Sequence, residues 1–263
     1  MYKQLPWGNK ILIGKGLRLI LFSEINLSEE CRRAVEHINY TEATDIQAAA
    51  IPLIMEGRDL IGRSNTGTGK TAAFGIPAVE SIVGDVRRPQ VLVLSPTREL
   101  AMQTCEEMRK FARFKEGVRI AAVFGGQPMD GQIRQLRTAN IVVGTPGRIM
   151  DHIRRRTLHL DEIRMVVLDE ATNANMGFGI FTFLSTPEER QTVLFSATMP
   201  PEILKITKEV QKDPEMVAVD KGRRTLDTIT QYFYQVPMGR KMDTLNLLLQ
   251  MQDAKKSIVF CNT

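Results

Sequence analysis

The chain has 263 residues and carries 35 Lys and Arg against 30 Asp and Glu, a formal charge of +5. With 43% hydrophobic and 25% charged residues it can bury a core, which excludes a globally disordered protein. The length lies between one and two typical domains. No apolar run is long enough to span a membrane. We expect a monomeric, cytoplasmic protein.

The positive charge is concentrated at the amino terminus. Residues 1–22 contain four bases and no acid, so residues 23–263 hold the remaining 31 bases and 30 acids. The overall charge is therefore weak evidence for a nucleic-acid partner. We expect residues 1–21 to form a poorly ordered basic leader rather than a signal peptide, because no small-residue cleavage site follows them.

Cys31, Cys105 and Cys261 are far apart, and the sequence has no CxxC. This pattern favours reduced thiols over a disulfide framework or a zinc site.

Short β-branched runs alternate with helical segments along the chain. Strands are predicted at 59–62, 91–95, 119–124, 140–144, 164–169 and 191–196. Helices are predicted at 28–38, 46–55, 69–83, 98–113, 129–138, 146–154 and 200–211. Strands joined by helix-length connections indicate an α/β fold with a mainly parallel sheet flanked by helices.

The composition changes at 214–228, a polar stretch that we interpret as a linker after a first domain at 22–213. A strand at 229–236, a helix at 239–252 and a strand at 257–261 are predicted beyond it. One βαβ unit cannot cover both faces of its own sheet. We therefore expect residues 229–263 to be the start of a second, incomplete domain.

A glycine-rich turn follows the strand predicted at 59–62 and precedes a helix. Its residues are Ser64, Asn65, Thr66, Gly67, Thr68, Gly69, Lys70 and Thr71. This context is typical of a phosphate-binding P-loop, in which backbone N–H groups contact phosphates, Lys70 reaches the β/γ-phosphates and Thr71 ligates Mg²⁺. The usual motif has Gly where Ser64 stands, and a chance glycine-rich turn is the alternative.

Asp169 and Glu170 end the strand predicted at 164–169. The carboxyl ends of parallel strands meet at one sheet edge, so this pair is expected beside the P-loop. Asp169 would hold Mg²⁺, and Glu170 would orient the attacking water. Helix N-terminal charges are the alternative interpretation.

The sequence resembles the DEAD-box RNA helicase family from Phe22 to Thr263. The segments that carry the resemblance occur in the family's order: Tyr40–Gln47, Ser64–Thr71, Pro96–Ala101, Gly125–Gly126, Thr145–Arg148, Asp169–Thr172, Ser196–Thr198 and Ser257–Thr263. The resemblance implies a RecA-like P-loop domain followed by part of a second one.

It also implies site residues. Thr44 and Gln47 would bind ATP, with Gln47 reading the adenine edge and Phe22 stacking on the base; a core Phe22 is the alternative. Ser196, Thr198 and Thr172 would couple the nucleotide to RNA binding. The RNA backbone would be held by Pro96, Thr97, Arg98, Gly125, Gly126, Thr145, Pro146, Gly147 and Arg148. First-turn helix residues are the alternative for Arg98 and Arg148.

Three features depart from the family pattern. Thr172 stands where the family has Asp, the segment 173–186 is short, and the chain ends inside the family's fourth motif, before its arginine finger. We expect the N-terminal ATPase half of an RNA helicase that binds ATP and Mg²⁺, hydrolyses ATP slowly and does not unwind without its C-terminal RecA-like partner. A catalytically silent ATP- and RNA-binding module is the alternative, and a P-loop ATPase acting on DNA or protein is a weaker one.

Overall fold

A computed structural model describes residues 2–4, 10–13, 20–65, 67–84, 86–170, 185–199, 201–219, 230, 232–251 and 256–260. The chain divides into two compact units, Met1–Lys221 and Gly222–Thr263. Each unit is described by itself.

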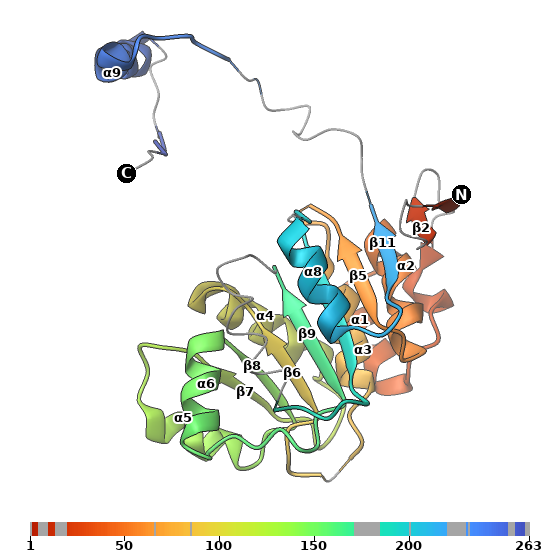
Figure 1. Ribbon diagram of the computed structural model, residues 1–263. Helices are drawn as coiled ribbons and strands as arrows, with labels where there is room; N and C mark the ends of the chain where they lie inside the picture. The colour runs from red at the N-terminus through yellow and green to blue at the C-terminus, as the bar shows by residue number, and fades with distance from the viewer. Residues whose placement is uncertain are drawn as a thin grey trace. The chain divides into compact units, whose positions relative to one another are not determined.

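The first unit is built on a sheet with the order β1-β2-β11-β5-β10-β9-β6-β8-β7 (Figure 1). The strands from β5 to β11 run parallel, β2 is parallel to β11, and β1 is antiparallel to β2. Their bounds are β1 Tyr2–Gln4, β2 Lys10–Ile13, β5 Leu60–Arg63, β6 Val91–Leu94, β7 Ile120–Val123, β8 Ile141–Gly144, β9 Met165–Asp169, β10 Gln191–Ser196 and β11 Glu215–Ala218.

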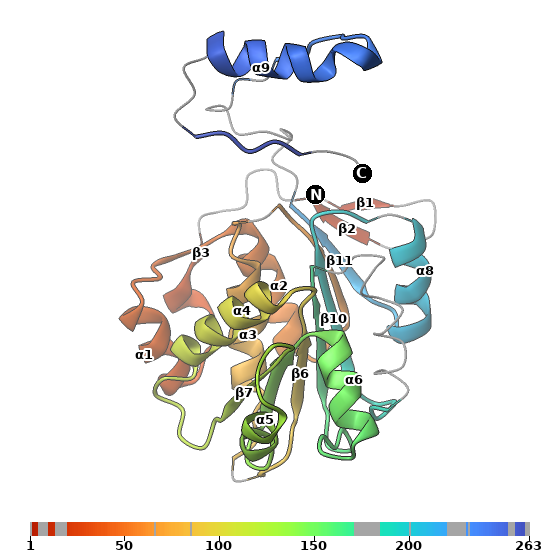
Figure 2. The same ribbon diagram turned by 90° about the vertical axis from the view of Figure 1, so that its left-hand side faces the viewer.

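Helices cover both faces of this sheet, with α1–α4 on one side and α6 and α8 on the other (Figure 2). Their bounds are α1 Glu29–His37, α2 Asp45–Met55, α3 Lys70–Glu80, α4 Arg98–Phe111, α5 Met129–Leu136, α6 Pro146–Arg154 and α8 Pro201–Val210. The α/β fold and every helix and strand predicted between residues 28 and 211 are confirmed, with small shifts at the ends.

The two helical layers explain why the strands read as continuous apolar runs. All four residues of Val91–Leu94 and all five of Met165–Asp169 are buried, because each strand is covered on both faces. One core cluster includes Phe74, Phe111 and Phe195, and the other includes Leu136 and Ile149.

The structure differs from the predicted linker at its beginning. Residues Glu215–Ala218 form β11, which pairs with β5, although we predicted a polar linker from residue 214. Val217 and Ala218 are buried, and Glu215 accepts a hydrogen bond from Arg58 at 2.8 Å. Three of its four residues are apolar, but the run is short and stands between polar segments, so it was missed.

Three short strands, β1, β2 and β3, lie inside the predicted leader. β2 pairs with β11 in parallel, with Ile11 opposite Met216 and Ile13 opposite Ala218. The open edge of β11 offers hydrogen-bonding groups to this β-branched run. A small hairpin of β3 (Ile20–Leu21) and β4 (Glu42–Ala43) follows, with a 3-10 turn at Phe22–Glu24. The order of the rest of 1–21 stays a prediction, because those residues lie outside the described ranges.

The second unit contains the helix α9 (Lys241–Met251), preceded by a 3-10 turn at Met238–Arg240. The strands predicted at 229–236 and 257–261 were wrong for the residues described there. The side chains of Phe233 and Phe260 are 87% and 92% exposed. A strand needs a hydrogen-bonding neighbour, and sequence propensity alone does not provide one.

Cys31 and Cys105 are buried free thiols, as predicted, and Cys261 lies outside the described residues. Burial, reinforced by Glu80, raises the pKa of Cys31 to about 12. None of the described helices is both long and apolar enough to cross a membrane.

Candidate functional site

The glycine-rich turn connects β5 to α3. Gly67 and Gly69 have φ of +77° and +87°, a left-handed conformation that favours glycine. Gly69 is the N-cap of α3, so the amide groups of Lys70 and Thr71 stand at a helix N-terminus. Unpaired N–H groups and the helix dipole make such a turn an anion-binding site.

The start of α2 braces this turn from the side. The Gln47 amide nitrogen donates to the Gly69 carbonyl at 3.1 Å, and the Thr44 hydroxyl donates to the Thr68 carbonyl at 2.8 Å. The Thr44 N–H in turn donates to Gln47 Oε1 at 2.9 Å. A Cβ atom on Gly69 would lie 2.2 Å from Gln47 Nε2, so this close approach requires glycine. Thr44 and Gln47 are therefore brought to the P-loop, as the resemblance implies.

Lys70 connects the P-loop to the end of β9. Its side chain is only 6% exposed, forms an ion pair with Glu170, and donates to the Ser64 carbonyl at 3.1 Å. Glu170 has a φ of +51°, which is strained for a residue with a side chain. Such strain is often found at functional sites, and here it accompanies the contact between Glu170 and Lys70.

Asp169 ends β9 and is 6% exposed. Its carboxylate accepts a hydrogen bond from the Thr104 hydroxyl at 3.3 Å. Burial and the neighbouring Glu170 raise the pKa of Asp169 to about 6, although Lys70 and Thr104 act in the opposite direction. A buried carboxylate with this pKa would gain from a nearby cation.

The end of β10 contributes further polar groups to the same edge of the sheet. Ser196 is buried, its carbonyl accepts from the Ser64 N–H at 3.3 Å, and its hydroxyl accepts from the Thr198 N–H at 3.3 Å. Because β10 lies between β5 and β9, Ser196 stands between the P-loop and Asp169. We call the loops after β5, β9 and β10 the P-loop half of the edge.

The residues of the P-loop half fit a nucleoside triphosphate with Mg²⁺. The turn leaves room above Gly67, where a Cβ atom would meet nothing within 4 Å. Lys70 supplies a cation, and Thr71 and Asp169 supply hydroxyl and carboxylate oxygens, the ligands that Mg²⁺ prefers.

The remaining predicted site residues follow β6, β7 and β8, on the other half of the same edge. Thr97 caps α4 by accepting from the Leu100 N–H at 3.3 Å, and Arg98 is the first residue of that helix. The predicted residues of this half are Pro96, Thr97 and Arg98 after β6, Gly125 and Gly126 after β7, and Thr145, Pro146, Gly147 and Arg148 after β8. We call these three loops the Arg98 half.

The two arginines of the Arg98 half differ in exposure, because Arg98 is exposed and Arg148 is half-buried. The Arg98 guanidinium lies 5.5 Å from the centre of the Phe124 ring, and its Nη1 would be 2.6 Å from a Cβ on Gly126. Arg148 makes a long contact of 3.5 Å with the Gln127 carbonyl. Both arginines therefore keep most of their donors available for an anion.

A buried network supports this half from inside, and the sequence did not reveal it. Gln132 donates to the Phe124 carbonyl at 2.8 Å, and its Oε1 lies 3.0 Å from His152 Nε2. His152 Nδ1 is 2.8 Å from the Thr157 hydroxyl. A neutral ring satisfies both contacts by donating at Nε2 and accepting at Nδ1. Burial lowers the pKa of His152, and Arg148 lowers it further.

The Phe22 ring does not present an exposed face to the P-loop half. It is 3% exposed, belongs to the core, and its ring centre lies 5.6 Å from that of Tyr40. Stacking on adenine needs a free face, so the structure favours the core alternative. Thr66 and Thr172 lie outside the described residues, as does most of the segment 173–186.

Thr104 is a functional candidate that sequence reasoning missed. It lies two turns into α4, and nothing in its local pattern indicates a contact with Asp169. Only the packing of α4 against the sheet brings the two residues together.

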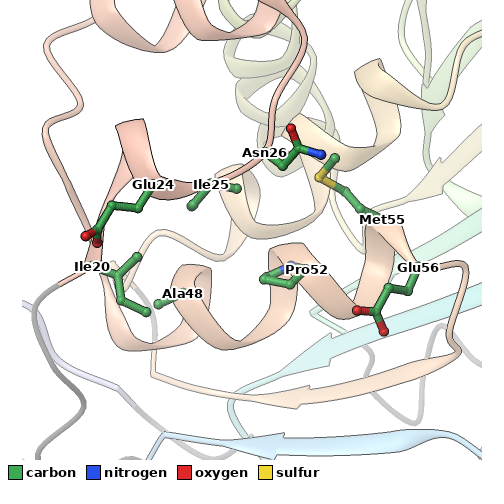
Figure 3. Close-up of a pocket in the computed structure, with 8 residues that line it drawn as sticks. All are labelled: Ile20, Glu24, Ile25, Asn26, Ala48, Pro52, Met55 and Glu56. Carbon is green, nitrogen blue, oxygen red and sulfur yellow. The ribbon is translucent and has the colours of Figure 1, made fainter.

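A cavity of about 660 Å³ lies between α2 and the segment from Ile20 to Asn26 (Figure 3). Its lining includes Ile25, Pro52 and Met55, with Glu24 and Glu56 as its charged groups. Acidic side chains repel phosphates, so this cavity is not the nucleotide site. It lies on the outer stripe of α2, formed by Ala48, Pro52 and Met55, whereas Gln47 is buried.

The model of the DEAD/DEAH box helicase family matches residues 44–206. The chain belongs to this family. The match includes the P-loop half and the Arg98 half together, in the order in which the sequence places them.

Two curated relatives are DEAD-box ATP-dependent RNA helicases named CshA. That of Geobacillus kaustophilus is 47% identical over 247 residues, covering 92% of this chain and 53% of its own. That of Bacillus subtilis is 45% identical over 249 residues, covering 93% and 50%. This chain therefore spans about half the length of these relatives.

A crystal structure of a DEAD box protein from Methanococcus jannaschii is also similar. It superposes with a TM-score of 0.73 at 36% identity, covering 88% of this chain and 63% of the other. This agreement confirms the helicase-type α/β fold.

Proposed function

We propose that this chain is the N-terminal ATPase half of an ATP-dependent RNA helicase. The observation that carries the proposal is the contact of Lys70 with Glu170, which joins the P-loop to the acidic pair across the intervening strand β10. The relatives named above are ATP-dependent RNA helicases, and the site residues present here are compatible with that activity.

ATP would bind with its phosphates against the turn from Asn65 to Gly69. Lys70 would leave the Ser64 carbonyl and donate to the phosphates, while Gln47 presents an amide next to the turn. Glu170 would hold the proton of the attacking water, because its carboxylate lies beside Lys70 at the same edge.

Mg²⁺ would be held by the Thr71 hydroxyl and the Asp169 carboxylate. When bound, it supplies positive charge that neutralises the phosphate oxygens. The Thr104 hydroxyl orients the Asp169 carboxylate by donating to one of its oxygens.

The Arg98 half would bind the RNA backbone. Arg98 and Arg148 donate to phosphates, and the exposed glycines Gly125, Gly126 and Gly147 allow the strand to approach the main chain. Ser196 and Thr198 would couple the two halves, since Ser196 touches the P-loop through Ser64.

A titration with a fluorescent ATP analogue in Mg²⁺ tests the proposal. We expect saturable binding that excess ATP competes and excess GTP does not. Lys70→Ala should weaken it at least about tenfold, because the phosphates lose a charged donor. Lys110→Ala, on the exposed face of α4, is the matched control. Absence of nucleotide binding to the chain would refute the proposal.

We further propose that residues 1–263 by themselves turn ATP over slowly and do not separate an RNA duplex. The supporting fact is that the matched region makes up only 53% and 50% of the two relatives. The test measures the RNA-stimulated release of phosphate from ATP, with and without a separately added C-terminal half. Fast turnover by the chain alone would contradict it, and the complete absence of turnover with the added half would favour a silent binding module. The cytoplasmic location and the monomeric state stay predictions.

A further inference from the structure

A second cavity, of about 390 Å³, lies at the opposite end of the sheet from the P-loop. It is lined by the segment that enters β6, the end of α5 with the residue after it, and the segment between α6 and β9. The strands run parallel, so segments that enter them lie at the end away from the arrowheads (Figure 1). A strand of four residues spans about 13 Å, which separates this cavity from the Arg98 half.

The charge of this cavity is one-sided. Ten residues line it, and they include Arg87, Arg88, Arg137, Arg156 and His159 but no Asp or Glu. We call it the arginine pocket. Arg88 forms an ion pair with Asp161 outside the lining. For the side chains of Arg87, Arg137 and Arg156, the described part of the chain contains no ion-pair partner within 4 Å.

The walls of the arginine pocket are apolar. Pro89, Ile133, Leu136 and Leu158 contribute to its lining, and Pro89 and Leu158 are buried. Cavities that bind small molecules measure about 300–1,000 Å³ and combine apolar walls with a few polar groups. An arginine guanidinium presents paired donors that match phosphate oxygens.

The sign of its charge distinguishes the arginine pocket from the cavity beside α2. That cavity is larger, but Glu24 and Glu56 are its charged groups. Of the two cavities, only the arginine pocket carries positive side chains for which the described residues offer no ion-pair partner.

We propose that the arginine pocket is a second phosphate-binding site, which takes a nucleotide-sized phosphate ester. Arg87, Arg137 and Arg156 hold the phosphate groups, and the apolar wall contacts the uncharged part of the ligand. The ester is either a free nucleotide or the phosphorylated end of an RNA strand.

Calorimetric titration with tripolyphosphate at low salt tests the site. The full chain carries Lys70→Ala in every sample, so that the P-loop does not compete and the proposed ATPase function has no influence on the result. We expect one binding event, weakened at least about tenfold by Arg87→Ala, Arg137→Ala and Arg156→Ala together. Arg119→Ala, Arg134→Ala and Arg154→Ala together, which remove the same charge from exposed positions outside the lining, should change it less than about twofold.

All six arginines are exposed, so neither triple variant removes core contacts, and matching thermal unfolding curves would verify folding. Equal affinity of the two triple variants for tripolyphosphate would overturn the proposal, as would the absence of any binding to the Lys70→Ala chain.

Two RNA oligomers of one sequence identify the source of the ester. A strand with a 5′-phosphate that binds at least about threefold more tightly than its 5′-hydroxyl counterpart, with the difference lost only in the pocket variant, assigns an RNA end. Equal binding of the two strands, together with pocket-dependent tripolyphosphate binding, assigns a free nucleotide.

Discussion

At the carboxyl edge of the sheet, the P-loop half buries its central polar side chains, whereas the Arg98 half leaves Arg98 exposed and Arg148 half-buried. Ser64, Lys70, Asp169 and Ser196 are all buried, as is Gln47, which braces this half from α2. Each contacts a polar group from another element. In the Arg98 half, Arg98 rests over a ring, and Arg148 makes long contacts with the Gln127 carbonyl and the Met129 sulfur.

The difference follows from what each half has to recognise. Buried polar groups must be satisfied, so the P-loop half is a network in which one residue fixes the next. An extended phosphate backbone needs donors that reach outward, and those donors need little mutual contact. Substitutions should therefore have large, connected effects in the P-loop half and smaller, separate effects in the Arg98 half.

The largest expected effect is that of Gly69→Ala. Its Cβ would collide with Gln47, and the left-handed backbone at φ +87° disfavours a side chain. We expect nucleotide affinity to fall about tenfold to a hundredfold, measured by the fluorescent ATP titration, with RNA binding in the absence of nucleotide unchanged. Gly84→Ala is the control, because no atom lies within 4 Å of its Cβ position and its backbone is not left-handed. A similar loss in both variants would mean that the effect is not local.

Arg98→Ala should act on the other half alone. Loss of a charged hydrogen bond to phosphate should weaken RNA binding about tenfold and reduce its salt dependence. Nucleotide affinity should stay within about twofold. Arg109→Ala, exposed on the same helix, provides the comparison. Fluorescence anisotropy of a labelled single strand at several salt concentrations measures both quantities, and equal effects of the two variants would count against a phosphate contact by Arg98.

Thr104→Val tests the connection between the halves, because α4 begins with Arg98 in one half and places Thr104 against Asp169 in the other. Losing one neutral-to-charged hydrogen bond should raise the Mg²⁺ concentration needed for half-maximal ATP binding about threefold. Thr104→Ser keeps the hydroxyl and should restore the wild-type value. If the serine variant behaved like the valine variant, packing rather than the hydrogen bond would be responsible.

The smallest effect concerns His152, which supports the Arg98 half through Gln132. Burial lowers its pKa in the folded state, so below a pH of about 6.5 the unfolded chain binds a proton that the native chain does not. Stability should therefore fall as the pH drops, by at most about 1.4 kcal/mol per pH unit from this group. Urea unfolding between pH 5.5 and 7.5 should show a shallower slope for His152→Gln than for His159→Gln. Identical slopes would show that His152 does not titrate in this way.

The sequence by itself determined the helices and the six parallel strands that it predicted between residues 28 and 211, and the positions of the P-loop and acidic pair. These depend on local signals: apolar runs covered on both faces, glycines at left-handed turns, and caps at helix starts. It also placed the acidic pair beside the P-loop, because parallel strands end on the same side of the sheet.

The tertiary structure decided what local pattern could not. The pairing of β11 with β5 made a strand from a short run inside the predicted linker, and strands predicted in the second unit did not form in the residues described there. The core position of Phe22, the Thr104–Asp169 contact and the arginine pocket each join segments that are distant in sequence. Their geometry comes from how helices pack on the sheet, which depends on the whole core rather than on neighbouring residues.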